Sequence, residues 1–165
     1  MLIGLLSDTH DNAVTAAAGV TLLKDARVEA VLHAGDLVSP EMLQHFEGLD
    51  VPFHLVLGNN EYDPAALRAR AAANGLFFYP EFADLTLGGK RIALAHGHEG
   101  ARLAALIRSG RYAYVVHGHT HVRRDEQVGP TRVINPGALQ RARVKSVAVL
   151  DTAADAVRFL ELPPV

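Results

Sequence analysis

The first half of the chain alternates short apolar runs with segments that carry helix signals. The apolar runs, which are typical of buried strands, are 2–6, 29–33 and 51–57. Each run is followed by a helix N-cap signal, namely Asn12, Ser39 before Pro40, and Asp63 before Pro64. The second of these helices should be short and end near Phe46, and the third should cover 65–74 and end at Gly75. This repeated order of strand and helix predicts a parallel sheet with covering helices.

The helix after Asn12 has one apolar face by spacing. Its members recur every three or four positions and are Val14, Ala17, Ala18 and Leu22. We therefore expect these four side chains to pack against the sheet.

The pattern changes in the second half, where strands follow one another more directly. The pair Gly88-Gly89 lies between the runs 84–87 and 90–95, which is a signal for a two-residue hairpin. A helix over 102–107 follows, and further strands are expected at 112–116, 131–134, 145–150 and 156–162. Late hairpins favour two sheets over a single doubly wound sheet. We predict an α/β fold, a two-sheet β-sandwich flanked by α-helices.

Length and charge limit the functional classes. The 165 residues are consistent with a single domain over 1–165, and 49 % hydrophobic residues are ordinary for a soluble globular protein. The formal charge is −2 and no basic stripe stands out, so we expect no binding of nucleic-acid polymers. One loose basic stretch is interpreted as solvated strand and loop faces in preference to a phosphate-binding surface: Arg123, Arg124, Arg132, Arg141, Arg143 and Lys145.

The absence of cysteine narrows the chemistry further. It excludes disulfides, thiolate metal sites and cysteine nucleophiles. Any metal must bind His, Asp, Asn or Glu, a donor set that suits hard or borderline divalent ions. No apolar run approaches the length of a membrane span, and the first residues lack the basic region of a signal peptide. We therefore expect no membrane association and a cytoplasmic location.

Polar side chains follow five of the apolar runs. The five clusters are Asp8-Thr9-His10, Gly35-Asp36, Gly58-Asn59, His96-Gly97-His98 and Gly118-His119-Thr120-His121. Ligand sites in open α/β sheets lie outside the carboxyl ends of the strands, so we expect these clusters to converge on one rim. Alternation along an extended backbone should point Asp8 and His10 the same way, and likewise His119 and His121.

Seven side chains in these clusters are candidate metal ligands. They are Asp8, His10, Asp36, Asn59, His96, His119 and His121. Seven protein ligands are too many for one catalytic ion with an open coordination position, but they suit two ions. A pair of ions requires a shared carboxylate, and Asp36 is the predicted bridge because one carboxylate offers two oxygens.

Taken in order, the motifs resemble those of the calcineurin-like metallophosphoesterases. They are Asp8-x-His10, Gly35-Asp36, Gly58-Asn59-x-Glu61, His96-Gly97-His98 and Gly118-His119-x-His121. Their order and the short loops are most similar to the small bacterial and archaeal phosphodiesterase branch, from residue 3 to about 137. Asp-x-His alone is a weak signal, whereas five motifs in order are a strong one. The resemblance implies a four-layer α/β/β/α sandwich.

The resemblance also implies a dinuclear phosphodiesterase. One ion would be held by Asp8, His10, Asp36 and His121, and the other by Asp36, Asn59, His96 and His119. Manganese is the metal expected first, with nickel, iron or zinc as alternatives. A hydroxide bridging the ions would attack the phosphorus of a small phosphodiester in line. Family habit also points to a homodimer.

One departure from the family concerns the leaving group. Many members carry a histidine after the motif asparagine, where it protonates the leaving group, but this chain has Asn60. An amide cannot act as an acid near neutral pH. Either the leaving group departs without a protein acid, or His98 or a metal-bound water takes this role. Asn60 and His98 are therefore the candidate catalytic residues.

Several motif neighbours are interpreted as supporting residues. His33 and His117 immediately precede motif turns, where hydrogen bonds to ligands or backbone carbonyls are expected. Glu61 should orient a ligand or a loop. The turn Asn135-Pro136-Gly137 resembles a family motif that packs beside the site. Two further histidines, in a helix end and a strand, are expected to be structural: His45 and His54.

Two other functions stay open. A phosphomonoesterase would use the same site, and the ratio of monoester to diester turnover would discriminate. A eukaryotic relative of this branch resembles a retromer subunit, which keeps the fold but serves as a protein-binding scaffold. Loss of ligand histidines would mark such a protein. This chain retains all seven ligand positions, which favours the enzyme.

Overall fold

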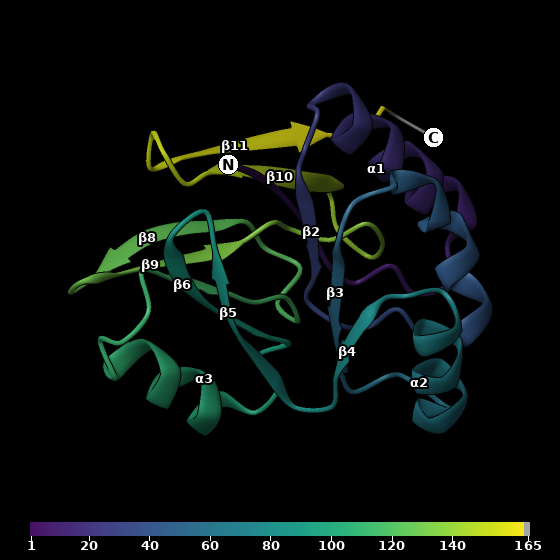
Figure 1. Cartoon of the computed structure of the whole chain (residues 1–165), viewed down its shortest axis with the longest axis horizontal. Coiled ribbons are helices and arrows are strands. Elements are labelled where there is room, and N and C mark those ends of the chain that lie inside the picture. The colour runs from purple at the N-terminus through teal and green to yellow at the C-terminus, as the bar shows by residue number, and fades with distance from the viewer. Residues whose placement is uncertain (164–165) are drawn as a thin grey trace.

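The computed structural model describes residues 1–163 and contains two β-sheets (Figure 1). The first is formed by β1 (Leu2–Leu6), β2 (Ala30–His33), β3 (Phe53–Val56), β4 (Phe77–Tyr79), β10 (Ser146–Asp151) and β11 (Ala156–Glu161). The second is formed by β5 (Phe82–Leu87), β6 (Lys90–Ala95), β7 (Tyr114–Val116), β8 (Arg124–Val128) and β9 (Thr131–Asn135). The helices are α1 (Ala13–Asp25), α2 (Pro64–Ala73) and α3 (Gly100–Arg108), with 3₁₀ turns at Pro40–His45 and Glu47–Leu49.

Three apolar cores separate four layers. The strand orders are β11-β10-β1-β2-β3-β4 and β5-β6-β7-β9-β8. One core joins the first sheet to α1, α2 and the 3₁₀ turns, and includes Leu6, Leu23, Leu43 and Leu67. The core between the sheets includes Ile3, Leu32, Leu94 and Ile134, and that under α3 includes Leu106 and Val115. Figure 1 shows α1 and α2 beside the first sheet and α3 beside the second, which confirms the predicted α/β/β/α sandwich.

Helix α1 packs on the sheet through a face that only partly overlaps the one that the sequence predicts. Its buried residues are Thr15, Ala16, Gly19, Val20 and Leu23. The predicted face is correct only in part: Ala18 and Leu22 are partly buried against the core, whereas Ala17 is exposed and Val14 is 60 % exposed. An alanine-rich helix is weakly apolar on several faces, so spacing alone does not select one. Close approach selects it, because a Cβ at Gly19 would lie only 3.0 Å from Leu139 Cδ2.

Two strands of the structure are absent from the sequence prediction, and both are sheet edges. β4 has three residues, too few for a pattern, and β8 reads Arg-Asp-Glu-Gln-Val. As an edge strand, β8 pairs only with β9 among residues 1–163, and charged side chains there discourage further pairing. The predicted hairpin is confirmed between β5 and β6, where Gly88 and Gly89 have φ of 56° and 72°.

Parallel pairing brings the five polar clusters together. β1, β2 and β3 run parallel in the first sheet, as do β6, β7 and β9 in the second. The loops after these strands are joined by backbone hydrogen bonds. Asp8 N donates to Gly35 O at 3.0 Å, and Gly118 N donates to His96 O at 2.9 Å. The structure therefore places the polar clusters along one rim.

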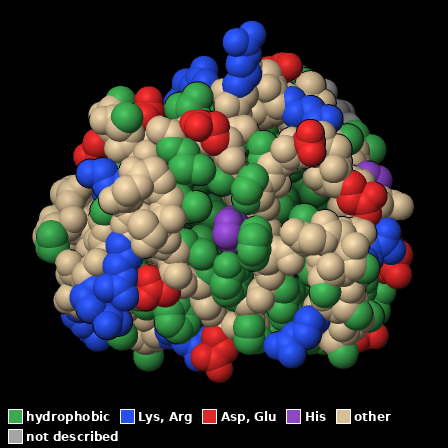
Figure 2. Space-filling view, viewed as in Figure 1, with side chains coloured by type: hydrophobic (Ala, Val, Ile, Leu, Met, Phe, Trp, Pro, Cys, Tyr) green, Lys and Arg blue, Asp and Glu red, His purple; other side chains and the backbone are tan. Residues whose placement is uncertain are grey.

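The surface is of mixed character. On the face seen in Figure 2, hydrophobic side chains surround a histidine near the centre, and charged side chains of both signs are distributed around the margin. Within residues 1–163, no helix combines the length and the apolar character needed to cross a membrane.

Candidate metal centre

Three candidate ligands enclose a small polar volume after β1 and β7. Nε2 of His121 lies 3.2 Å from Oδ1 of Asp8 and 3.3 Å from Nε2 of His10. Nε2 of His10 lies 3.9 Å from the same Asp8 oxygen. The side chain of Asp8 is fully buried, and that of His121 is 20 % exposed. A carboxylate oxygen and two imidazole nitrogens thus converge from loops of both sheets.

A second set of ligands surrounds Asp36. Its Oδ1 lies 3.4 Å from Nε2 of His96, while its Oδ2 lies 3.6 Å from Nε2 of His10. Oδ1 of Asn59 lies 3.1 Å from the same His96 nitrogen. The two oxygens of Asp36 therefore face opposite halves of the site. Two groups of three residues have ligand atoms within 4.8 Å of one another: Asp8, His10 and His121, and Asp8, Asp36 and His96.

His98 and His119 lie on the solvent side of His96. Their ring centroids are 5.4 Å and 5.1 Å from that of His96. The backbone N–H of His119 donates to Oδ2 of Asp8 at 3.1 Å, but among the residues described its ring joins neither three-residue group. The His98 side chain is 32 % exposed and 3.8 Å from the Glu99 carboxylate. His98 is thus accessible to a molecule bound at the rim.

The donor atoms fit divalent cations. Oδ1 of Asp8 is buried without a hydrogen-bond partner in residues 1–163, which is unusual for a carboxylate oxygen. Nδ1 of His96 lies 2.7 Å from Ala34 O, and Nδ1 of His121 lies 3.2 Å from the carbonyl oxygen of Arg141. Donation to these carbonyls leaves Nε2 of both rings directed into the site, as in metal-binding imidazoles. Nitrogen and oxygen donors without sulfur suit manganese, nickel, iron and zinc.

Five of the seven candidate ligands have left-handed backbone conformations. Their φ angles are 55° at Asp8, 45° at His10, 58° at Asp36, 68° at His119 and 58° at His121. Such conformations are rare outside glycine, cost about 1–3 kcal/mol each and cluster at functional sites. The prediction that alternation along extended backbone aligns these side chains is wrong, because tight turns carry them. The convergence at the rim arises from the turns.

Two motif glycines allow close approach to the aspartates. A Cβ at Gly58 would overlap Oδ1 of Asp36. A Cβ at Gly118 would overlap Ser7 Oγ and lie 2.8 Å from Oδ2 of Asp8. Any side chain at either position would displace a candidate ligand, so both glycines are required by the shape of the site.

Glu61 connects two loops of the site from beneath. Its carboxylate accepts hydrogen bonds from the backbone N–H of Leu37 at 2.9 Å and of Gly58 at 2.8 Å. Burial raises the pKa of Glu61 above its ordinary value. The expectation that this residue orients a loop is confirmed.

Asn60 contacts a candidate ligand directly. Its Nδ2 donates to Oδ2 of Asp36 at 2.6 Å, and its backbone N–H donates to Oδ1 at 3.1 Å. Although burial opposes it, hydrogen bonds from His96 and Asn60 hold the pKa of Asp36 well below its usual range. Asp36 is therefore ionised near neutral pH.

His117 supports the turn that carries His119. Its Nδ1 lies 3.0 Å from the carbonyl oxygen of Gly118, and burial lowers its pKa to about 4. Nδ2 of Asn135 donates to the same carbonyl at 2.9 Å and to Thr120 Oγ1 at 3.0 Å. The turn at Asn135 therefore packs beside the site, as the sequence predicts.

His33 supports the Asp36 turn from the protein interior. Its Nδ1 accepts a hydrogen bond from Gly35 N at 3.1 Å. Its Nε2 lies 2.8 Å from Thr9 Oγ1, so the neutral ring carries its proton on Nε2. Burial lowers the pKa of His33 to about 3.

This burial predicts a dependence of stability on pH. Between an unfolded pKa of about 6.5 and the folded value, the unfolded chain binds a proton that the native state does not, so stability falls with falling pH. Burial of His33 is therefore expected to lower the free energy of unfolding by about 2 kcal/mol at pH 5 relative to pH 7. His33→Gln should be less stable than the wild type at pH 7, and this gap should narrow by about 2 kcal/mol at pH 5. Urea unfolding of EDTA-treated protein measures both values, and a gap unchanged between the two pH values would contradict the assignment.

Two further histidines have contacts that do not involve the candidate ligands. His54 stacks on Phe77 with centroids 4.7 Å apart, and its Nδ1 lies 3.1 Å from Tyr79 Oη. His45 ends the first 3₁₀ turn, where its Nε2 lies 3.4 Å from the side-chain amide nitrogen Nε2 of Gln44. These packing contacts agree with the structural roles expected for both residues.

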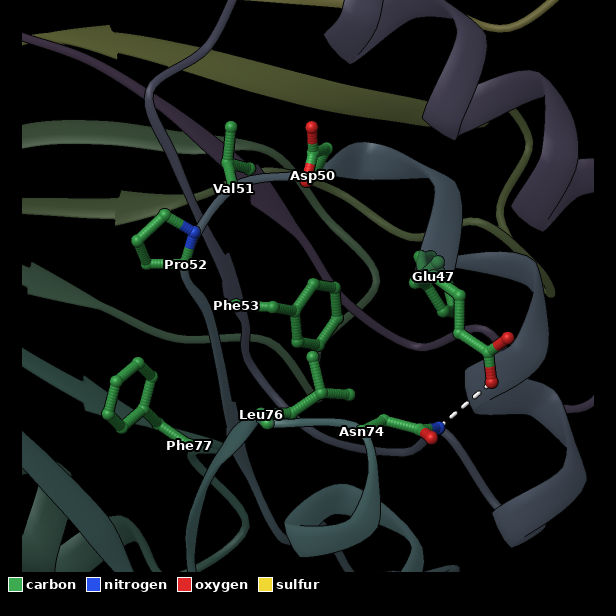
Figure 3. A pocket seen from close by; sticks show the side chains of 10 residues that line it. Glu47, Asp50, Val51, Pro52, Phe53, Asn74, Leu76 and Phe77 are labelled. Carbon is green, nitrogen blue, oxygen red and sulfur yellow. Dashed lines mark hydrogen bonds between the residues drawn. The ribbon is translucent and has the colours of Figure 1, made fainter.

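A cavity of about 570 Å³ lies at the amino ends of β3 and β4 (Figure 3). Its lining is mixed: the apolar side chains of Phe46, Val51, Phe53, Leu76 and Phe77 lie beside Glu47, Asp50 and Asn74. At its side, Asn74 Nδ2 donates to Glu47 Oε1 at 2.9 Å. The candidate ligands follow the carboxyl ends of the strands, so this cavity is not part of the metal centre.

Sequence reasoning missed two residues that hold ligands in place. Ser7 Oγ donates to Oδ2 of Asp8 at 2.6 Å. A hydroxyl directly before the first motif is a signal that could have identified it. The carbonyl of Arg141 orients His121 from 20 positions away. That contact depends on the path of the chain after β9, and no sequence pattern indicates it.

Comparison with known proteins adds independent findings. The model of the calcineurin-like phosphoesterase superfamily domain matches residues 1–155. A phosphodiesterase of Methanocaldococcus jannaschii is 32 % identical over 165 residues, which cover 98 % of this chain and 99 % of that protein. A solved archaeal phosphodiesterase has a TM-score of 0.91 at 30 % identity, covering 98 % of this chain and 100 % of the other. Wild-type Vps29 of Entamoeba histolytica, solved with Zn²⁺, has a TM-score of 0.70 at 21 % identity and 98 % coverage of each chain.

Proposed function

We propose that this chain, which belongs to the calcineurin-like phosphoesterase superfamily, hydrolyses small phosphodiesters with two divalent metal ions bound at the rim. The observation that carries the proposal is the buried, unpartnered Oδ1 of Asp8, which faces the imidazole nitrogens of His10 and His121. The relative from Methanocaldococcus jannaschii is named a phosphodiesterase and matches nearly end to end. Family and donor set together support a metal-dependent phosphoric ester hydrolase.

The candidate ligands divide into two sets, each of which would hold one ion. One set is Asp8, His10, Asp36 and His121, and the other is Asp36, Asn59, His96 and His119. Asp36 would be shared, because its two oxygens face His10 and His96 separately. Bound divalent ions lower the pKa of water and stabilise the charge that develops on phosphoryl oxygens.

The side chains around the ligands set the leaving-group requirement. Hydrolysis forms a bond from a water oxygen to phosphorus and breaks the bond to the leaving oxygen, which then takes up a proton. Asn60 cannot transfer a proton and instead holds Asp36. His98 is accessible at the rim, but burial lowers its pKa, so the ring is largely neutral at pH 7. Phosphodiesters whose leaving groups depart without protonation should therefore be hydrolysed best.

Hydrolysis of bis(4-nitrophenyl) phosphate tests this function. Protein stripped with EDTA should be inactive, and addition of Mn²⁺, Ni²⁺, Fe²⁺ or Zn²⁺ should restore release of 4-nitrophenolate, with Mn²⁺ as the first ion to try. Failure of all four ions to support turnover would refute the enzyme. Parallel assays with 4-nitrophenyl phosphate give the ratio of diester to monoester turnover. A ratio well below one would replace the phosphodiesterase with a phosphomonoesterase that uses the same site.

A non-catalytic scaffold role is the second candidate. Turnover in the same assay would contradict it. The likeness to Vps29 shows a shared fold at 21 % identity. A scaffold has no need of a complete ligand set, whereas this chain keeps all seven positions. Homodimerisation and a cytoplasmic location stay predictions of the sequence.

A further inference from the structure

The basic stretch near the C-terminus divides into paired and unpaired cations. Arg123 lies 2.9 Å from Glu161, Arg124 lies 2.6 Å from Glu126, and Arg132 lies 2.7 Å from Asp125. These three are solvated ion pairs, as the sequence suggests. Within residues 1–163, three later cations form no ion pair, and they share the loop after the Asn135 turn: Arg141, Arg143 and Lys145. This segment, residues 141–145, is called the basic loop below.

The basic loop begins at the metal centre and is anchored to it. Gln140 N donates to the carbonyl oxygen of Asp8 at 3.1 Å, and Leu139 N donates to that of Ser7 at 3.1 Å. The carbonyl oxygen of Arg141 lies 3.2 Å from Nδ1 of His121. Arg141 itself is held in a left-handed conformation with φ of 57°. The backbone of Arg141 is thus fixed to His121 and that of its neighbour Gln140 to Asp8, while the side chain of Arg141 is exposed.

Arg141 carries an unpaired positive charge at the edge of the metal centre, because its side chain is exposed and forms no ion pair within residues 1–163. Its backbone contact with His121 fixes the start of this side chain beside the ligand atoms. Two divalent ions would exceed the charge of Asp8 and Asp36 together, so the loaded rim is electropositive and Arg141 extends that potential outward.

We propose that Arg141 binds a second negative charge of the substrate, so that the site prefers phosphodiesters bearing a further phosphate group on an ester substituent. The inference rests on the proposed phosphodiesterase function. The reacting diester has one negative charge, which the metal ions would neutralise. A guanidinium pairs with a phosphate through two parallel hydrogen bonds, which makes arginine the suitable residue for a second phosphate. Arg143 and Lys145 lie farther along the loop and contribute only general positive potential.

Matched dinucleotides test the preference. The substrates are the dinucleoside monophosphate dTpdT and its two forms with one terminal phosphate, pdTpdT and dTpdTp, with products followed by chromatography. The wild type should hydrolyse at least one phosphorylated form with a kcat/KM about tenfold above that of dTpdT. This ratio corresponds to the free energy of about one charge-assisted hydrogen bond. Arg141→Met should reduce this ratio to about one. Arg143→Met, which removes the same charge two positions away, should retain most of it.

Binding gives a readout that does not depend on turnover. In the metal-loaded protein, thymidine 3′,5′-bisphosphate should bind about tenfold more tightly than thymidine 5′-monophosphate, and Arg141→Met should remove the difference. The assignment would be overturned if Arg141→Met and Arg143→Met lost this affinity difference equally. It would also be overturned if the wild type bound the two nucleotides with equal affinity. Turnover of bis(4-nitrophenyl) phosphate separates the two hypotheses. Its absence would refute the phosphodiesterase, whereas turnover without a charge preference would refute only the role of Arg141.

Discussion

Asp8→Asn is expected to lower turnover by about a thousandfold while leaving the metal-free protein at least as stable as the wild type. Oδ2 of Asp8 accepts hydrogen bonds from Ser7 Oγ and His119 N, and an asparagine oxygen can accept both. The amide nitrogen would then replace the unpartnered Oδ1, 3.2 Å from Nε2 of His121, and donate to it. The substitution removes a buried unpaired oxygen and its charge, which stabilises the fold. It also removes the ligand that both three-residue groups share.

Thermal unfolding with and without metal measures both effects. At a metal concentration about 100 times Kd, the wild-type Tm should rise by about 5–10 °C, whereas that of Asp8→Asn should not rise. Asp25→Asn, at the exposed end of α1, is the matched control and should respond as the wild type does. Metal affinity is measured directly by calorimetry. Wild-type affinity in Asp8→Asn, or a metal-free protein clearly less stable than the wild type, would refute the assignment of Oδ1.

The strand ends explain why so much of the site could be predicted from the sequence. The run 2–6 becomes β1, and Asp8 and His10 follow it directly. The same relation holds for Asp36 after β2 and for His96 after β6. Because parallel strands end at a common edge, chain order and strand type were sufficient to bring these residues together. No knowledge of the loops was needed for that step.

The orientation of the ligands could not be obtained in the same way. An extended backbone was the simplest assumption for Asp8 and His10, but both have positive φ. That conformation is imposed by contacts with other loops, such as the hydrogen bond from His10 N to Asp36 O at 3.0 Å. Long-range hydrogen bonds leave no periodic pattern in the sequence. The contact between Arg141 and His121 was missed for the same reason.

The packing face of α1 shows a different limit. Hydrophobicity placed Val14 toward the sheet, whereas the structure buries Gly19 there and leaves Val14 exposed. Burial area favours large side chains, but a close helix-to-sheet contact beside Leu139 favours the smallest one. Shape complementarity of this kind is a property of two surfaces, and one surface alone does not reveal it.

Gly118→Ala is expected to destabilise the protein by about 3 kcal/mol or more and to abolish metal binding with it. The added Cβ would overlap Ser7 Oγ and lie 2.8 Å from Oδ2 of Asp8. Ser7 is fully buried and hydrogen-bonded to Asp8, so neither side chain can move without disturbing the other. The loop that carries His119 must therefore shift away from the first strand. Urea unfolding and metal titration of the purified variant measure the two effects.

Two companion variants separate this overlap from a general effect of alanine. Gly100→Ala places the same methyl group at the start of α3, where nothing lies within 4 Å, and stability should be unchanged or slightly higher. Ser7→Gly removes the hydroxyl that the new Cβ meets, so the double variant Ser7→Gly/Gly118→Ala should be more stable than the sum of the two single effects predicts. Additive effects in this cycle would contradict the overlap. The contact with Asp8 would persist in the double variant, so metal binding should recover less than stability does.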